Sequence, residues 1–515
     1  MTLTADIASD EVFTPIARQI RQHAASRPGN VAIICDERLL DYRDLDVLMD
    51  RVAASLQRDG VRPGDVVAIC ANSSIEYAAV FLGALRAAVA VAPLAPSSSP
   101  ENLAGMMQDC GARTLFLDSA VAGLIPQAPD VSSLVRVSLD GSDAGLPLAT
   151  WLTDSDVEPH PVEIDPEAPF NIIYSSGTTG TPKGIVQSHG MRWAHIRRAA
   201  PLGYDAGAVT LCSTPLYSNT TLVSFFPALA GGGAIVLMPK FEAATFLALA
   251  ERHRVTHAML VPIQYQRLLD VPEFECYDLS GFRMKFCTSA PFAAALKEQV
   301  LRRWPGALVE IYGSTEGGGT CLLFADQHPT KLHTVGRPAP GHDIRLIDEQ
   351  GREVPPGSEG EIVGRSSAMM SGYHHRDDKT SEIHWFDERG NRYFRTGDIG
   401  RFDADGFLTL VDRKKDMVIS GGFNVYPSDI EAVLARHEAV KDAAVIGVPS
   451  AQWGETPVAF VELKSESLVT AEQLREWANA QLGKAQRLSA VRLVSALPRS
   501  AIGKILKREL REVDI

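Results

Sequence analysis

Helical and strand-like patterns of hydrophobic residues alternate along the first part of the chain. Apolar residues recur every three to four positions between residues 45 and 56, which predicts an amphipathic helix with one buried face. Short apolar runs at 66–70, 89–93 and 114–118 are each separated from the next by a helical pattern. Apolar strands that alternate with amphipathic helices are typical of a largely parallel, helix-covered sheet.

The pattern changes in later parts of the chain. Residues 141–167 are polar and aperiodic, which predicts a connection into a next subdomain, where the alternation resumes. Short strands with turns dominate residues 334–412 and predict a compact β subdomain. We therefore expect an α/β fold: residues 1–412 would form a large N-terminal domain of two wound α/β subdomains plus the β subdomain. Residues 413–515 would form a small α+β domain.

Two helix starts in the small C-terminal domain carry a further local signal. Ser428 precedes Glu431 by three positions, and Thr470 precedes Gln473 by the same spacing. In a capping box, the first side chain accepts a backbone N–H and the second reaches back to the start of the helix. We therefore predict a capping box at the start of each helix.

Charge and cysteine usage exclude several classes of function. The net charge is −13, and no basic run is interleaved with aromatic residues, so nucleic acid and anionic membranes are not expected partners. The seven cysteines are scattered and form no CxxC pair, which indicates free thiols in a reducing compartment. The first residues carry acids instead of a signal pattern, and the most apolar segment is interrupted by Arg86. We expect a soluble cytoplasmic protein without a membrane span.

Residues 172–184 combine glycines and hydroxyl side chains with Lys183 after an apolar run. Backbone N–H groups, hydroxyls and an ammonium can surround a phosphate. A Walker A loop requires Ser or Thr directly after its lysine and then a helix, whereas Gly184 and a second apolar run follow here. The pattern predicts a loop between two strands, and its composition alone is also compatible with an ordinary surface turn.

Four further stretches share this character, at residues 311–319, 393–398, 412–416 and 498–507. Each stretch by itself is weak evidence for a functional site. In this order and spacing, the five motifs together resemble the adenylate-forming (AMP-binding) superfamily of acyl- and aryl-CoA synthetases, luciferases and peptide-synthetase adenylation domains. The resemblance extends over nearly the whole chain.

The resemblance implies a two-step reaction that uses ATP, Mg²⁺ and coenzyme A. A carboxylate would attack the α-phosphate of ATP to give an acyl-adenylate and pyrophosphate, and a thiol would then take the acyl group. Such a catalyst has to neutralise the repulsion between carboxylate and triphosphate and align the reacting oxygens.

The resemblance also implies roles for individual residues of the nucleotide site. Glu316 would hold Mg²⁺, although such an acid can also be a solvated turn residue. The residues assigned to the nucleotide are Thr178, Thr179 and Lys183 around the β- and γ-phosphates, Ser175 at the start of the same loop, Thr315 beside the α-phosphate, Asp398 and Arg413 at the ribose, and Tyr312 against the adenine.

Lys504 resembles the lysine that bridges the substrate carboxylate and the α-phosphate during adenylation; the alternative is a solvated lysine in a terminal helix. Lys415 occupies the position of the hinge about which the family's small, mobile domain rotates. Gly421 and Gly422 would line the tunnel for the pantetheine arm of CoA. The context of Lys504 also resembles sites that lysine acetyltransferases modify in this family, and acetylation would remove its charge.

The acyl pocket departs from the family pattern, because Ser218 stands where many acyl-CoA synthetases carry a histidine. No acid occurs between residues 213 and 224, which argues against an amino acid substrate. None of the residues expected to line the pocket is a spare arginine that could neutralise a second carboxylate, so an apolar or aromatic carboxylic acid is expected in place of a dicarboxylate. The residues expected to line the pocket are Tyr217, Ser218, Gln264, Ala290 and Gly313.

Three functions are compatible with these patterns. The first is an AMP-forming acid–CoA ligase for a fatty or aromatic acid, which we favour. The second is an adenylating enzyme that passes the acyl group to a carrier-protein thiol or oxidises the adenylate. The third is an ATP-binding regulatory protein without catalysis, which the intact set of motif residues argues against. A homodimer is a further expectation.

Overall fold

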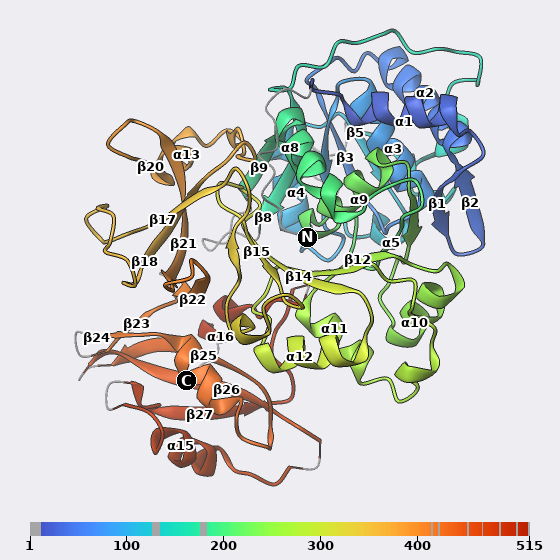
Figure 1. Ribbon diagram of the computed structural model, residues 1–515. Coiled ribbons are helices and arrows are strands. Elements are labelled where there is room, and N and C mark those ends of the chain that lie inside the picture. The colour runs from blue at the N-terminus through green and yellow to red at the C-terminus, as the bar shows by residue number, and fades with distance from the viewer. Residues whose placement is uncertain are drawn as a thin grey trace. The chain divides into compact units, whose positions relative to one another are not determined.

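The structure is a computed structural model (Figure 1). It describes residues 12–125, 134–175, 183–413, 416–420, 423–450, 453–465, 467–483, 486–500 and 503–512. The chain passes more than once between two compact units, which are described separately. Unit 1 comprises Met1–Leu332, Pro338–Asp343 and Gly364–Phe394, and unit 2 comprises His333–Arg337, Ile344–Val363 and Arg395–Ile515.

The first sheet of unit 1 contains the strands that flank the predicted phosphate loop. Its central strands β4, β3, β5 and β6 are parallel, whereas β8 and β9 form an antiparallel hairpin at one side. The strand order is β19 (Gly372–Tyr373), β9 (Lys183–Ser188), β8 (Pro169–Ser175), β4 (Ala90–Pro93), β3 (Val66–Cys70), β5 (Thr114–Leu117), β6 (Val135–Ser138) and β7 (Leu146–Pro147).

The second sheet of unit 1 is parallel from β14 to β1. Its order is β16 (Arg337–Pro338), β15 (Cys321–Phe324), β14 (Ala307–Tyr312), β13 (Met284–Cys287), β12 (His257–Leu260), β10 (Val209–Cys212), β11 (Ala234–Leu237), β1 (Val31–Cys35) and β2 (Arg38–Asp41).

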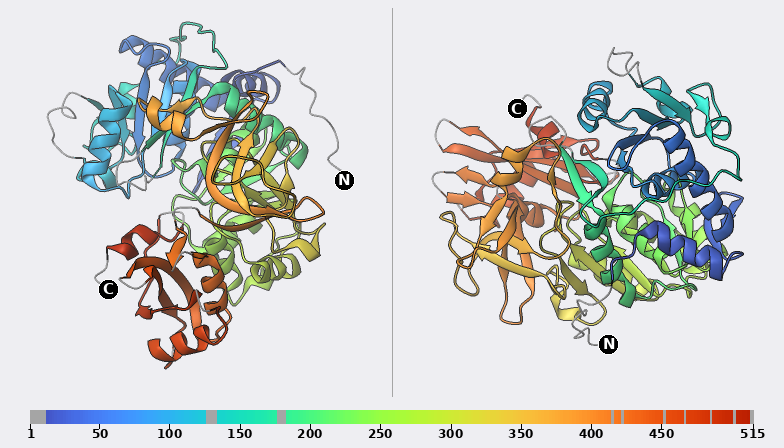
Figure 2. Two further views of the ribbon diagram at one scale, coloured as in Figure 1. Left: turned by 90° about the vertical axis from the view of Figure 1, so that its left-hand side faces the viewer. Right: turned by 90° about the horizontal axis from the view of Figure 1, so that it is seen from above.

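Helices cover both large sheets of unit 1. The helices α1, α2 and α3, which are blue in Figures 1 and 2, pack against one another. The helices of unit 1 are α1 (Ile16–Ser26), α2 (Tyr42–Arg58), α3 (Ile75–Arg86), α4 (Pro100–Cys110), α5 (Ser119–Ala122), α7 (Leu148–Trp151), α8 (His189–Ala199), α9 (Asn219–Ala230), α10 (Ala243–Arg252), α11 (Pro262–Leu269), α12 (Ala294–Arg303) and α13 (Asp377–Glu382). Within the described ranges, no helix has both the length and the apolar character needed to cross a bilayer.

Strand β3 illustrates how the core of unit 1 forms. Successive side chains of a strand point to opposite faces of its sheet. Val67 and Ile69 accordingly belong to the large core cluster that also contains residues of α2, α3 and α9. Ala68 and Cys70 belong to a second cluster, packed with residues of α4. Both faces of this sheet are therefore buried, as its continuous apolar strands predict.

The smaller sheets contain the remaining strands. One has the order β17 (Asp343–Ile347), β18 (Gly360–Arg365), β21 (Arg392–Phe402) and β20 (His384–Phe386), with β22 (Leu408–Arg413) paired to β21. The other, in unit 2, has the order β24 (Phe423–Val425), β23 (Val418–Ser420), β26 (Gly454–Leu463) and β25 (Val440–Ser450), with β27 (Ala490–Val494) paired to β26. The helices of unit 2 are α14 (Pro427–Leu434), α15 (Ala471–Asn479) and α16 (Lys507–Arg511).

The expected α/β class, with a large N-terminal and a small α+β C-terminal part, is confirmed, but three connections differ from expectation. The polar stretch before β8 leads back to the first sheet, where β8 pairs with β4. The hairpin β1–β2, which the hydrophobic pattern did not reveal, joins the second sheet through β11. Strand β19, expected within a separate β subdomain, pairs with β9. Each difference is a pairing between segments distant in sequence, on which local periodicity carries no information.

One of the two predicted capping boxes is confirmed. The Thr470 side chain accepts the N–H of Gln473, and the Gln473 side chain accepts the N–H of Thr470. The box at Ser428 is wrong, because α14 begins at Pro427 and the Ser428 hydroxyl donates to the carbonyl of Val411. The side chain that the local pattern assigned to the helix cap therefore makes a tertiary hydrogen bond instead.

Candidate active site

The predicted acyl-pocket residues follow neighbouring parallel strands of the second sheet. Tyr217 and Ser218 follow β10, Gln264 follows β12, Ala290 follows β13, and Gly313 follows β14. These four strands are adjacent in the order β14-β13-β12-β10. The carboxyl ends of adjacent parallel strands meet at one edge of the sheet, which is where open α/β sheets bind ligands. The topology therefore assembles at one edge a set of residues that span about a hundred positions of sequence.

Hydrogen bonds between loops hold this edge together. The Thr220 hydroxyl lies 2.6 Å from the Ser289 hydroxyl, and the Thr288 hydroxyl donates to the carbonyl of Ile311 at 2.8 Å. Ser289 has a left-handed backbone with φ of 77°. A non-glycine residue in this conformation costs about 1–3 kcal/mol and persists only where surrounding contacts enforce it. The loop after β13 is thus fixed to the start of α9 on one side and to β14 on the other.

Two of the predicted pocket residues, Gln264 and Ser218, are buried. Gln264 is buried; its Oε1 accepts the N–H of Val261 at 3.2 Å, and its Nε2 donates to the Ser213 hydroxyl at 3.2 Å. Its amide is therefore held at both ends. Ser218 is buried immediately before α9, and its side chain makes no capping hydrogen bond with that helix.

Glu316 and Lys183 are linked through Tyr373, a residue that we did not predict. The Tyr373 hydroxyl donates to Glu316 Oε1 at 2.9 Å, and Lys183 Nζ lies 5.1 Å from the centre of the Tyr373 ring. Burial and the adjacent Glu316 carboxylate both raise the pKa of Tyr373, so its hydroxyl remains a donor at neutral pH. One aromatic ring thus positions the predicted metal ligand and contacts the predicted phosphate-binding lysine.

The turn between β14 and β15 positions Glu316 through its glycines. Gly317 has φ of 81°, and a Cβ there would lie 1.9 Å from the carbonyl oxygen of Ala368. The carbonyl of Glu316 accepts the N–H of Met370 at 2.8 Å. Gln187 Nε2 donates to the carbonyl of Thr315 at 2.7 Å. No side chain can be added at Gly317 without moving backbone, because the turn lies directly against the neighbouring segment.

The predicted phosphate loop connects two antiparallel strands, as expected. The backbones of Ser175 and Lys183 are register partners at the ends of β8 and β9. Thr178 and Thr179 lie outside the described residues. The hairpin thus places the two ends of the loop side by side, and Lys183 is partly buried at the point where β9 begins.

Unit 2 carries Asp398 and Arg413, which form an ion pair. They are register partners on β21 and β22, with Arg413 Nε 3.0 Å from Asp398 Oδ1. The Asp398 carboxylate is mostly buried, with 15% of its side chain exposed. The Thr396 hydroxyl accepts the Asp398 N–H at 3.1 Å. The carboxylate is therefore oriented by its neighbours.

Lys504, also in unit 2, is exposed on a tight turn that precedes α16, so it does not lie in a terminal helix. The N–H of Lys504 donates to the Ser500 hydroxyl at 3.2 Å, and its carbonyl accepts the N–H of Ser500 at 2.8 Å. Gly503 has φ of 76°, which the turn requires. Lys415, Gly421 and Gly422 lie outside the part of the chain for which we describe contacts.

An arginine that is not among the predicted acyl-pocket residues lies near one of them, Gly313. Arg198 Nη1 donates to the Thr320 hydroxyl at 3.0 Å. That hydroxyl lies 3.3 Å from the position that a Cβ on Gly313 would occupy. Arg198 is on α8, more than a hundred residues before Gly313, and only the acid-free run of basic residues in that helix signalled it. Tyr373 gave no comparable signal.

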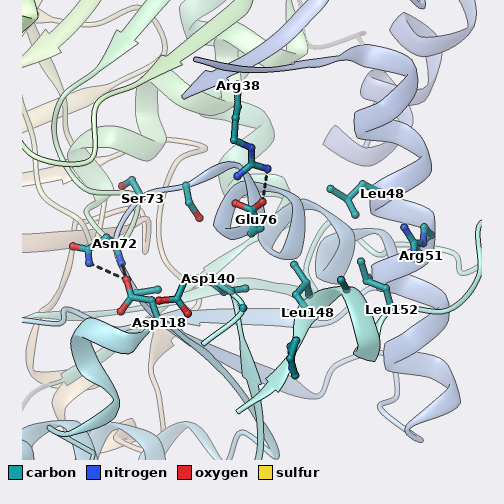
Figure 3. Close-up of a pocket in the computed structure, with 16 residues that line it drawn as sticks. Arg38, Leu48, Arg51, Asn72, Ser73, Glu76, Asp118, Asp140, Leu148 and Leu152 are labelled. Atoms are coloured by element: carbon teal, nitrogen blue, oxygen red, sulfur yellow. Dashed lines mark hydrogen bonds and ion pairs between the residues drawn. The ribbon is translucent and has the colours of Figure 1, made fainter. Parts of the chain in front are cut away.

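A cavity of about 620 Å³ lies elsewhere in unit 1 and is lined by none of the predicted site residues. Figure 3 shows two interactions at its wall: Asn72 donates to Asp118, and Arg38 pairs with Glu76 at 2.5 Å. Two of its wall residues therefore already satisfy each other's charge.

The chain is similar to known proteins over nearly its whole length. Residues 20–374 match the family model of the AMP-binding enzyme, and residues 429–504 match that of the AMP-binding enzyme C-terminal domain. The chain is 32% identical to indoleacetate–CoA ligase of Aromatoleum aromaticum, over 97% of this chain and 98% of that protein. It is 31% identical to the fatty acid–[acyl-carrier-protein] ligase ScoC of Streptomyces coeruleorubidus, over 95% and 94%. Among solved structures, the amide bond synthetase McbA from Marinactinospora thermotolerans aligns with a TM-score of 0.86 at 28% identity, over 96% of this chain and 98% of that one.

Proposed function

The chain belongs to the AMP-binding enzyme family, and on this premise we propose that it is an ATP-dependent carboxylic acid–CoA ligase. The observation that carries the proposal is the arrangement of Lys183, Tyr373 and Glu316 beside the edge that gathers the acyl-pocket residues. It supports a site in which a polyphosphate and a carboxylic acid are held together.

In the proposed first step, a carboxylate oxygen of the acid attacks the α-phosphorus of ATP, and pyrophosphate leaves. Lys183, Thr178, Thr179 and Ser175 would hold the β- and γ-phosphates, because an ammonium, hydroxyls and backbone N–H groups stabilise the charge that moves onto the leaving group. Thr315 would lie beside the α-phosphate.

The remaining nucleotide contacts are proposed from the same premise. Asp398 would accept hydrogen bonds from the ribose hydroxyls, for which its oriented and mostly buried carboxylate is suited. Arg413 would hold that carboxylate in place. Tyr312 would stack on the adenine.

Glu316 would hold Mg²⁺ together with phosphate oxygens. Within the described ranges, no group of three or more His, Cys, Asp or Glu side chains could enclose a metal ion. A single carboxylate fits Mg²⁺ in a nucleotide enzyme, since this ion is usually bound by one or two carboxylates plus substrate phosphates and water. When bound, the ion would neutralise charge on the phosphates.

Lys504 would bridge the attacking carboxylate and the α-phosphate, and the exposed turn that carries it supports such a role. In the second step, the thiolate of CoA attacks the acyl carbonyl, and AMP leaves. Lys415 would act as the hinge between the two steps, and Gly421 and Gly422 would line the pantetheine tunnel. The division of the chain into domains at residues 412 and 413 is part of this proposal.

A second candidate differs in the acceptor of the acyl group. The likeness to ScoC, whose acceptor is a carrier protein, favours a carrier-protein thiol in place of CoA. The pyrophosphate-forming step and its residues are the same in both candidates, so the two differ only in the second half-reaction.

One assay separates these candidates. The protein is incubated with ATP, Mg²⁺ and a panel of fatty, benzoic, indoleacetic and phenylpropenoic acids, and AMP and pyrophosphate are measured with and without CoA or an acyl-carrier protein. Formation of an acyl-CoA supports the ligase, and thioester formation only on the carrier protein supports the second candidate. Absence of pyrophosphate release with every acid of the panel and with dicarboxylic acids would overturn both.

Three finer features also belong to this proposal. We expect a cytoplasmic enzyme, on the basis of its free cysteines. We expect it to form a homodimer, which sedimentation at several concentrations tests. Acetylation of Lys504 by a lysine acetyltransferase would suppress adenylation by removing its charge; an acetylated protein with the full rate would contradict this expectation.

A further inference from the structure

Helix α8 contains five basic residues and no acidic residue, and three of the five share one side. Arg192, His195 and Arg198 are spaced three residues apart, so they follow one another along one side of the helix. Basic groups this close to one another repel, and proteins usually place acids between them. The described residues contain no carboxylate in an ion pair with any of the three.

Arg192 is the deepest of the three. Only 1% of its surface is exposed, and its guanidinium lies over the rings of Phe170 and Phe226 at 5.7 and 5.8 Å. Its Nε donates to Asn171, whereas its Nη1 and Nη2 are enclosed and have no hydrogen-bond partner. Burial lowers the pKa of Arg192 to about 9, so it is cationic at neutral pH. Enclosed and unsatisfied donors of this kind are rare in native proteins.

His195 is a second buried basic residue of α8 with a polar atom that lacks a hydrogen-bond partner. It is buried, and its Nδ1 has no hydrogen-bond partner. Burial and the adjacent Arg198, Arg192 and His342 lower its pKa, which keeps its ring neutral. A neutral imidazole can still donate one hydrogen bond.

Arg198 connects this basic side of α8 to the acyl pocket. Its contact with the Thr320 hydroxyl uses one of the five N–H groups of a guanidinium. Thr320 is further held by His342, whose Nδ1 accepts the Thr320 N–H at 3.0 Å. Burial lowers the pKa of Arg198 to about 10, so it too is cationic at neutral pH. Gly313 and Thr320 lie opposite each other where β14 and β15 begin to diverge, and Gly313 is exposed.

A buried cation without a counter-charge is unfavourable, and an anion bound beside it offsets that cost. The anion must reach the site from outside the chain, since the described residues offer no carboxylate partner. Gly313 is one of the predicted acyl-pocket residues and lies beside Thr320, so under the proposed function the acyl substrate would be bound close to Arg198.

We propose that the acid activated by this enzyme carries a second anionic group, most simply a second carboxylate, and that Arg198 binds it with Thr320 beside it. This inference rests on the proposed function. The reacting carboxylate has to face the α-phosphate, so the group bound by Arg198 is at the other end of the molecule. Arg198 offers a planar fork of donors that matches a carboxylate in bidentate geometry.

The test compares dicarboxylic acids with their own monomethyl esters, which have nearly the same shape but lack the second charge. An aliphatic series and a benzene series cover two shapes of pocket, and a hydroxy acid in each series supplies a neutral acceptor. The readout is kcat/KM for pyrophosphate release. We expect a wild-type preference of about 10–100-fold for a dicarboxylic acid over its ester, as charge-assisted hydrogen bonds provide.

Arg198→Met should remove this preference and keep activity on the monoester, whereas Arg198→Lys should retain part of it. Arg197→Met is the matched control, because it removes a neighbouring positive charge from the same helix and should leave the preference unchanged. Circular dichroism and the melting temperature establish that each variant is folded.

The outcomes separate this inference from the proposed function. Pyrophosphate release with some acids, but with esters or hydroxy acids preferred in every pair, overturns the inference alone. An equal loss of activity on all acids in Arg198→Met also overturns it, since that result shows a structural role. A wild-type protein that releases pyrophosphate with no acid overturns the proposed function and this inference with it.

Discussion

The hydrogen bond between Tyr373 and Glu316 leads to the sharpest prediction about the metal requirement. Tyr373→Phe removes one hydroxyl and leaves the ring, which packs against Ile185 and Met370 and lies under Lys183. The lost contact is a 2.9 Å hydrogen bond to a carboxylate. Such bonds contribute about 1.5–3 kcal/mol, which corresponds to about 10–150-fold in an equilibrium constant.

Loss of this hydrogen bond should weaken the binding of Mg²⁺, since Tyr373 acts by orienting Glu316. Partners that orient a metal ligand typically contribute about 10–100-fold in affinity or activity. We therefore expect the half-saturating Mg²⁺ concentration for pyrophosphate release to rise by about 10–100-fold, with a smaller change in kcat at saturating Mg²⁺. The measurement is a Mg²⁺ titration of the initial rate at saturating ATP and acid.

Tyr393→Phe is the matched control, because it too removes a tyrosine hydroxyl from a carboxylate, that of Asp343 at 2.5 Å. Asp343 has no assigned role in nucleotide binding, so this variant should require Mg²⁺ as the wild type does. The reasoning is refuted if Tyr373→Phe changes the half-saturating concentration less than twofold, or if both variants change it equally.

Three further predictions concern catalysis, domain movement and pH. Lys504→Ala should slow adenylation at least ~100-fold and affect thioester formation from a supplied acyl-adenylate much less; equal loss in both half-reactions would contradict its role. Lys415→Pro should keep pyrophosphate release and block thioester formation, because proline fixes φ at the proposed hinge, and retention of both activities would exclude the hinge. Burial lowers the pKa of His189 to about 4. Between about pH 6.5 and 4 the unfolded chain therefore binds a proton that the native protein does not, and the unfolding free energy should fall by about 2–3 kcal/mol from this group as pH falls. Urea denaturation of the wild type and His189→Gln at about pH 7 and 4.5 measures this term, and equal pH dependence of the two would exclude it.

Much of the fold was predictable because its signals are local. The strands at Val66–Cys70 and Met284–Cys287 and the capping box at Thr470 depend on residues within a few positions of one another. The hairpin at the phosphate loop is equally local, since β8 and β9 are joined directly by that loop. Hydrophobic periodicity and turn chemistry report such elements well.

The order of the motifs can also be read from the sequence alone, and this order indicates the family to which the chain belongs. Which distant segments meet depends instead on the tertiary fold. It placed β1 and β2 in the second sheet, β19 beside β9, and Tyr373 between Lys183 and Glu316. It also brought Arg198 to Thr320 across more than a hundred residues. Local patterns report which face of an element is buried, whereas the partner of that face is chosen by packing and parallel strand pairing, which no local pattern encodes.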